Sequence, residues 1–109
     1  MTISIKSGSA AARMAGIRTE ALAALVVAAA VYEQHGEDCR LTAATDSKHM
    51  PGSLHYVGLA IDIGPPPPHK KTQIVADLKA ALGDDFDVVD EANHLHIEFQ
   101  PKRGVNLAL

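Results

Sequence analysis

The sequence has few of the residues that mark several common classes of protein. It contains one cysteine and no tryptophan, and aromatic residues make up 4% of its 109 positions. One cysteine excludes an intramolecular disulfide framework and a cysteine-rich zinc finger. Lys and Arg total 10 against 13 Asp and Glu, and the formal charge of -3 argues against nucleic acid as a partner.

Long apolar stretches are lacking as well. The longest, residues 21–32, falls short of the roughly 20 residues that cross a bilayer, so it predicts a buried helix and no membrane span. The N-terminal residues 1–9 contain no apolar core of a secretory signal, and we therefore expect a protein that is cytoplasmic as synthesised. The length and a hydrophobic content of 47% predict one folded domain over residues 1–109, which we expect to be a monomer.

The spacing of apolar residues predicts an α+β fold. A first helix is expected from Thr19, as its N-cap, to His35, with Gly36 as the stop. A second helix is expected from an N-cap at Thr72 to Gly83. In the first helix the predicted inward positions are Leu22, Leu25, Val26, Ala29 and Ala30.

Five short segments have the pattern of strands, and the last two are close enough to form a hairpin. Together with the two main helices they predict a small, mostly antiparallel sheet with the helices packed on it. The proline run 65–68 is expected to end the strand before it, because proline cannot donate a backbone hydrogen bond. The predicted strands are residues 3–5, 39–44, 59–63, 86–90 and 94–99.

Six residues are histidine, and two of them share a face of the last predicted strand. Alternation places His94, His96 and Glu98 opposite the apolar side chains of the same strand. A second predicted strand carries Asp62 among apolar residues, with Gly58 before it. Histidines and a carboxylate are the ligands of a catalytic zinc, which commonly keeps one position open for water. Taken singly, each of these side chains is explained more simply by a solvated strand face.

The two segments together resemble a known family. Ser-x-His-x-x-Gly-x-Ala-x-Asp runs from Ser53 to Asp62, and His94-x-His96 follows about thirty residues later. This order resembles that of the zinc D-Ala-D-Ala carboxypeptidases and the related L-alanyl-D-glutamate endopeptidases. The hedgehog signalling domain is similar in both pattern and fold. The resemblance covers residues 41–99 and implies a hedgehog-like α+β domain.

The resemblance implies one zinc ion, Zn²⁺, with His55, Asp62 and His96 as its ligands. It implies that Glu91 holds the zinc-bound water as the general base and that His94 stabilises the oxyanion. A different register stays open, because the acid of these peptidases often stands three residues before the last ligand. Counted from Glu91, that spacing makes His94 the ligand in place of His96.

The resemblance is less complete for substrate binding. Ser53 opens the first motif, and His49 lies where similar sequences carry another histidine that lines the site. Many relatives have an arginine before this motif that grips the carboxylate of the peptide. Residues 42–48 contain no arginine, so Lys48 or Arg40 remains as a candidate for that contact.

The function implied by the resemblance is zinc-dependent hydrolysis of peptide bonds in peptidoglycan-type peptides. The small size favours a phage lysis protein or a stand-alone bacterial enzyme that acts on the cell wall after release. A non-catalytic zinc-binding interaction module of hedgehog-like fold is the main alternative. A domain that uses zinc only for stability is a third, and chelation would unfold such a domain.

Overall fold

The computed structural model describes residues 3–7, 12, 14, 16–44 and 58–101. Of the predicted site residues, Asp62, Glu91, His94 and His96 fall within these ranges. Four others, Lys48, His49, Ser53 and His55, lie outside the described residues.

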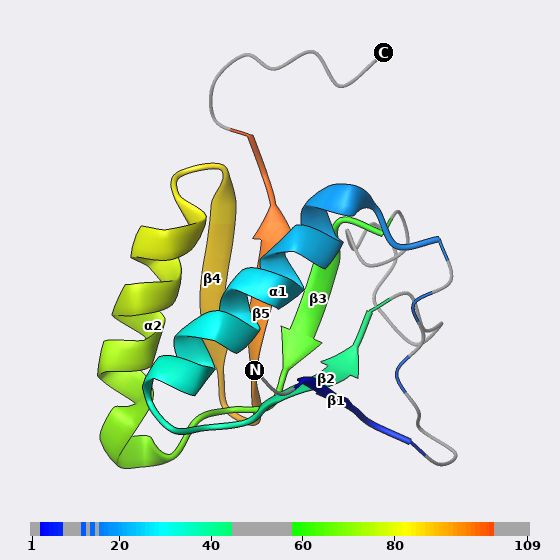
Figure 1. Ribbon diagram of the computed structural model, residues 1–109. Helices are drawn as coiled ribbons and strands as arrows, with labels where there is room; N and C mark the ends of the chain where they lie inside the picture. The colour runs from blue at the N-terminus through cyan, green and yellow to red at the C-terminus, as the bar shows by residue number, and fades with distance from the viewer. Residues whose placement is uncertain (1–2, 8–11, 13, 15, 45–57, 102–109) are drawn as a thin grey trace.

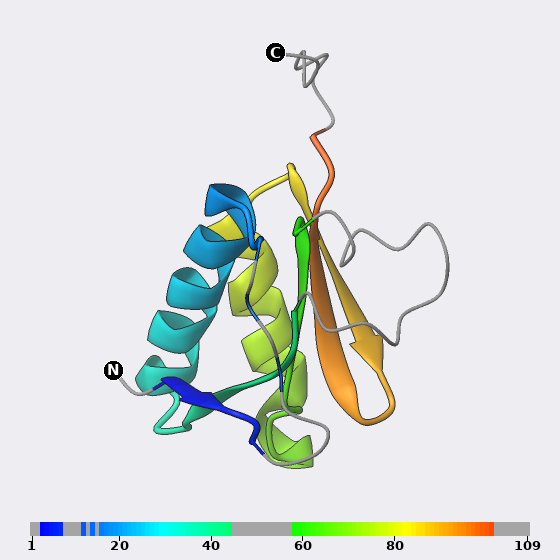
Figure 2. The same ribbon diagram turned by 90° about the vertical axis from the view of Figure 1, so that its right-hand side faces the viewer.

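The fold is a single mixed sheet with two helices on one of its faces (Figures 1 and 2). The strand order is β1-β2-β3-β5-β4, with β1 and β2 parallel and the other three pairings antiparallel. The prediction of an α+β domain with two main helices and a mostly antiparallel sheet is confirmed. The elements are β1 (Ile3–Ile5), α1 (Thr19–Gln34), β2 (Cys39–Ala43), β3 (Ala60–Ile63), α2 (Pro68–Leu82), β4 (Phe86–Glu91) and β5 (His94–Phe99).

Helix α1 ends in a Schellman motif, as the glycine after it suggested. Gly36 has a φ of 72° and donates its N–H to the carbonyl of Glu33, at 2.9 Å. The N–H of Glu37 donates to the carbonyl of Tyr32, also at 2.9 Å, so the final carbonyls of the helix are satisfied. At the other end Arg18 is the N-cap, and the prediction of Thr19 as the cap was wrong by one residue.

The predicted inward face of α1 was wrong in part. Leu22 and Val26 are 42% and 44% exposed, and Ala30 is exposed as well, whereas Leu25 and Ala29 are buried. Residues 21–32 of this helix form an unbroken apolar stretch, so the spacing of apolar residues could not fix its rotation. The side that packs on the sheet is rich in alanine, which lets the helix axis approach closely. The buried residues are Ala21, Ala24, Leu25, Ala28, Ala29, Val31 and Tyr32.

Helix α2 begins at Pro68, four residues before the predicted cap at Thr72. Proline is favoured in the first turn, because its missing N–H would have no partner there and its φ already suits a helix. The proline run therefore starts this helix as well as ending β3. Ile74 and Leu78 of α2 are fully buried and face the core.

The core lies between the helices and the sheet face that carries Ile61, Ile63, Leu95 and Ile97. Cys39 is fully buried in it, and burial raises the pKa of its thiol to about 12. All four residues of β3 are buried, so this central strand is covered on both faces. In the part of the chain that is described, no helix has the length and apolar character needed to cross a bilayer.

Candidate functional site

Two residues from separate sequence motifs meet on the sheet face opposite the helices. Strands β3 and β5 pair antiparallel with Asp62 directly opposite His96, so both side chains project from the same face. His96 Nδ1 lies 2.8 Å from Asp62 Oδ1. Asp62 is 8% exposed and His96 is half-buried. The contact is therefore a hydrogen bond partly shielded from water.

His94 joins this pair from two residues earlier on β5. Its Nε2 lies 3.7 Å from Asp62 Oδ1, and its Nδ1 lies 2.6 Å from the side-chain oxygen of Asn93. A neutral Asn oxygen accepts, so Nδ1 donates and the ring is oriented with Nε2 towards Asp62. Both histidines of the His-x-His pair thus face one carboxylate, with His96 the nearer.

Glu98 completes the cluster, and the sequence analysis gave it no role. Its Oε1 lies 2.7 Å from His96 Nε2, and Gln100 Nε2 donates to its other oxygen. Alternation along β5 had already placed Glu98 on the face of the two histidines. The sequence offers no further signal for its role. The contact of Glu98 with His96 becomes visible only in the structure, where Glu98 stands opposite the small, fully buried Ala60.

The electrostatics of the cluster favour a cation at His96. Its hydrogen bond to Asp62 raises the pKa of His96, burial opposes this, and the hydrogen bond to Glu98 adds to the rise. The buried carboxylate of Asp62 and the half-buried carboxylate of Glu98 therefore flank one imidazole and stabilise its protonated form. The same arrangement stabilises any other cation that takes the place of the proton.

Glu91 lies at the edge of this group. It is the last residue of β4, it is exposed, and it pairs in register with His94. Register partners share a face of the sheet, so Glu91 lies on the same face as Asp62 but two strands away from β3.

Arg40 is the one described candidate for substrate binding. Its neighbours on β2, Cys39 and Leu41, are buried in the core, and Leu41 pairs with Ile63. Alternation therefore places the exposed Arg40 on the same face of the sheet as Asp62.

The donor atoms fit part of a zinc site. Imidazole and carboxylate are the ligand types of catalytic zinc centres, and Asp62 Oδ1 lies near both His96 Nδ1 and His94 Nε2. Within the described ranges, no group of three or more His, Cys, Asp or Glu side chains is placed so that it could hold a metal ion. The third predicted ligand, His55, falls outside those ranges.

Gly58 shows why the first motif carries a glycine. Its φ is 75°, and a Cβ there would run into the carbonyl oxygen of Gly16 and lie 3.0 Å from the backbone nitrogen of Arg18. The N–H of Arg18 donates to the carbonyl of Gly58 at 2.9 Å. The segment before α1 is thus fixed against the chain that leads into β3.

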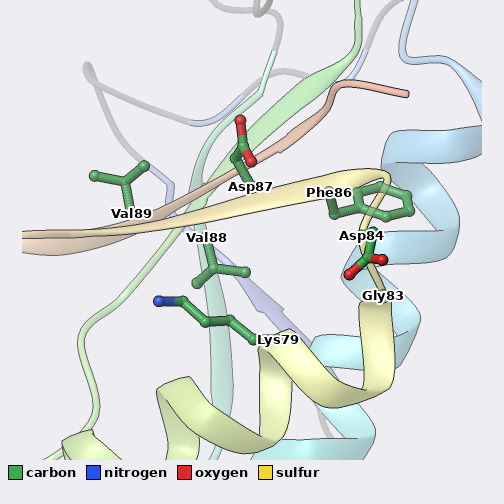
Figure 3. A pocket seen from close by; sticks show the side chains of 7 residues that line it. All are labelled: Lys79, Gly83, Asp84, Phe86, Asp87, Val88 and Val89. Carbon is green, nitrogen blue, oxygen red and sulfur yellow. The ribbon is translucent and has the colours of Figure 1, made fainter. Parts of the chain in front are cut away.

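The hollows found between α2 and β4 are separate from this cluster. One of them is lined by Lys79, Phe86, Val88 and Val89 among others, and Figure 3 shows Lys79 extending beside Val88. The other is lined mainly by residues of α2, with Asp90 from β4. Neither of these two hollows includes a residue of the Asp62, His96 and Glu98 cluster.

Comparisons with known proteins add no family assignment. No model of a protein family matches the chain, and no curated protein matches it.

Proposed function

We propose that this chain is a zinc-dependent peptidase that hydrolyses peptide bonds in peptidoglycan-type peptides, as a carboxypeptidase or a cell-wall endopeptidase. The observation that carries the proposal is the 2.8 Å contact between Asp62 and His96. These residues come from two separate motifs, and the resemblance to zinc peptidases assigns both to one metal ion. The α+β fold with a mostly antiparallel sheet agrees with a hedgehog-like domain, which is part of the same proposal.

In this proposal Asp62 and His96 would hold the metal together with His55. Zinc, when bound, supplies Lewis acidity and lowers the pKa of a bound water to about 7. Glu91 would act as the general base, taking a proton from the attacking water and giving it to the leaving amine. His94, oriented by Asn93, presents Nε2 towards the side of Asp62 and stabilises the oxyanion.

The substrate class follows from the resemblance and is supported by one feature of the sheet. Peptidoglycan-type peptides end in a carboxylate, which needs a cationic partner. Arg40 is exposed on the face of Asp62, and a guanidinium offers a bidentate fork that the ammonium of Lys48 lacks. Arg40→Lys should therefore raise KM for peptides with a free C-terminus and leave kcat nearly unchanged.

Metal content and hydrolysis test the proposal together. Wild-type protein purified from zinc-replete medium should contain one zinc ion per chain by mass spectrometry of the metal. Asp62→Ala and His96→Ala should lose the metal and the hydrolysis of peptidoglycan peptides, whereas Asp90→Ala, from the helix-facing side of β4, should keep both. Wild-type protein that binds no zinc would overturn the assignment.

A non-catalytic zinc-binding module remains the second candidate, and the exposure of Glu91 favours it. A base that stands in water beside the cluster is less well placed than one packed against the metal ligands. Hydrolysis and zinc content of the wild type and of Glu91→Gln separate the two functions. If the chain is an enzyme, the wild type hydrolyses the peptides and Glu91→Gln loses hydrolysis but keeps zinc. If it is a binding module, the wild type already shows no hydrolysis.

A further inference from the structure

Strand β4 is the outermost strand of the sheet on the side of α2 (Figure 1). Within the described ranges no strand pairs with its far edge. An open edge presents a row of backbone N–H and C=O groups, with which another extended chain can pair. The far edge of β4 is therefore a place where a further strand can join the sheet.

The hydrogen-bond pattern shows which backbone groups of β4 face this open edge. The N–H of Gln100 donates to the carbonyl of Asp85 at 2.7 Å, and this pair continues the register of β4 with β5. Hydrogen-bonded and non-hydrogen-bonded pairs alternate along an antiparallel ladder. The N–H and C=O groups of Val88 and Asp90 therefore point away from β5. In the part of the chain that is described, no hydrogen bond to these groups is found.

The two hollows beside α2 lie along this edge. The first is lined by Val88 and also by Asp87 and Val89, whose side chains lie on the other side of β4 (Figure 3). This hollow therefore passes around the edge of the strand. The second is lined by Asp90 and by residues of α2, and Lys79 borders both hollows. Open space thus accompanies the backbone groups that have no partner strand.

The sheet face away from the helices favours basic side chains on a joining strand. Asp87, Val89 and Glu91 of β4 lie on that face, because they pair in register with the polar side of β5. A strand added to β4 places every second side chain next to these three. Opposite charges on neighbouring strands attract, so Lys or Arg fits beside the two acids.

The helix-facing side of the edge favours apolar side chains. Asp90 is already paired there with Lys71, at 2.7 Å between Nζ and Oδ1. Lys79 adds a second positive charge, and its stem lies beside Val88 (Figure 3). A basic side chain on this side would meet Lys79, whereas an apolar one can cover Val75 of the second hollow. The two faces together require a chain in which basic and apolar residues alternate.

We propose that the open edge of β4 binds an extended basic peptide, with Lys or Arg alternating with apolar residues, as an additional strand of the sheet. A second copy of the chain is a poorer occupant. Pairing β4 with itself would bring together two strands that each carry Asp87, Asp90 and Glu91 and no basic residue. The inference is independent of the proposed zinc site.

An NMR titration of the wild-type protein with a capped hexapeptide of alternating valine and lysine tests the proposal. The amide signals of Val88 and Asp90 should shift, whereas those of β1, the strand at the opposite edge of the sheet, should not. The same peptide with glutamate in place of lysine should bind at least about five-fold more weakly. Shifts confined to other elements, or equal binding of both peptides, would show that the proposal is wrong.

Methylation of the peptide amides tests backbone pairing without altering the protein. Successive N–H groups of a strand point to opposite sides, so methylating every second amide blocks one edge of the peptide. At least one of the two half-methylated peptides should keep the affinity of the unmodified one. Methylating all amides should cost at least about five-fold, because no N–H then remains to pair with β4. Full affinity of that peptide would exclude strand addition.

Two variants with the same change of charge test the electrostatic part. Asp87→Asn should weaken binding of the lysine peptide by about 1.5- to 5-fold. Asp38→Asn is the matched control, because Asp38 is exposed just before β2, three strands away from β4 in the sheet. Equal weakening by both variants would reduce the effect to net charge and refute a specific site.

Analytical ultracentrifugation tests the other occupant. The wild-type protein should stay monomeric at the concentrations of the titration. A dimer that Asp87→Asn strengthens would assign the edge of β4 to a second copy of the chain and overturn the proposal. Zinc content and hydrolysis enter none of these measurements, so the result stands apart from that of the proposed function.

Discussion

Replacing Gly58 by alanine should destabilise the fold more than any other glycine-to-alanine change considered below. The φ of 75° costs an L-residue about 1–2 kcal/mol. The new methyl group would also displace the backbone around Gly16 and Arg18, and overpacking of this kind costs about 1–3 kcal/mol. The sum, about 2–5 kcal/mol, is a large part of the roughly 5–15 kcal/mol that stabilises a typical domain.

Two other glycines separate the contributions to that cost. Gly36 has a φ of 72° but open space around it, so Gly36→Ala should cost only the backbone strain of about 1–2 kcal/mol. Gly64 has an ordinary φ, and a Cβ there would lie 3.7 Å from the Cβ of Arg40. Gly64→Ala should therefore change stability by less than about 0.5 kcal/mol.

Urea unfolding followed by far-UV circular dichroism measures all three variants, because the chain has no tryptophan to report by fluorescence. The unfolding free energy should be highest for Gly64→Ala, lower for Gly36→Ala and lowest for Gly58→Ala. The three variants should have similar m-values. If Gly58→Ala costs no more than Gly36→Ala, the close approach of the two backbone segments is refuted.

Three further predictions concern the core and the helix contact. The Cys39 thiol, buried and with its pKa raised to about 12, should react with thiol reagents at pH 8 only when urea unfolds the chain. Ala28→Leu should cost about 1–3 kcal/mol by overpacking, whereas Val26→Gln on the exposed side of α1 should cost less than about 0.5 kcal/mol, both by urea unfolding. The hydrogen bond from His35 holds the pKa of Asp77 below its usual value, so its stabilising effect is present at neutral pH and is lost as the pH falls below 3.8. The urea midpoints of wild type and Asp77→Ala should therefore differ at pH 6 and converge in acid; a difference that stays constant would contradict this.

The sequence predicted the strands more accurately than the helices. Alternation along 94–99 correctly separated the buried Leu95 and Ile97 from the polar face, because one side of that strand is apolar and the other is not. Helix α1 offers no such contrast, and its exposed Leu22 and Val26 are as apolar as its buried residues. The start of α2 was missed because proline both ends strands and begins helices.

The candidate site was predicted in its residue types but not in its contacts. The motifs indicated that Asp62 and His96 belong to one site, yet only the pairing of β3 with β5 puts them opposite each other. That pairing joins segments about thirty residues apart, and local pattern holds no information on its register. The same register brings Glu98 to His96, a contact that the sequence analysis did not anticipate.

Burying the carboxylates of this cluster costs folding free energy, and that cost is an argument that the cluster serves a function. β3 is buried along its whole length, and a carboxylate at Asp62 costs free energy there unless a cation or donors compensate it. His96 compensates it in its protonated form, but Glu98 then adds a second carboxylate, which is half-buried, beside the same ring. Apolar side chains at such positions are often as stable or more stable than buried ion pairs. Two carboxylates around a histidine make physical sense where a cation is to be held, which is what the proposed function requires of this cluster.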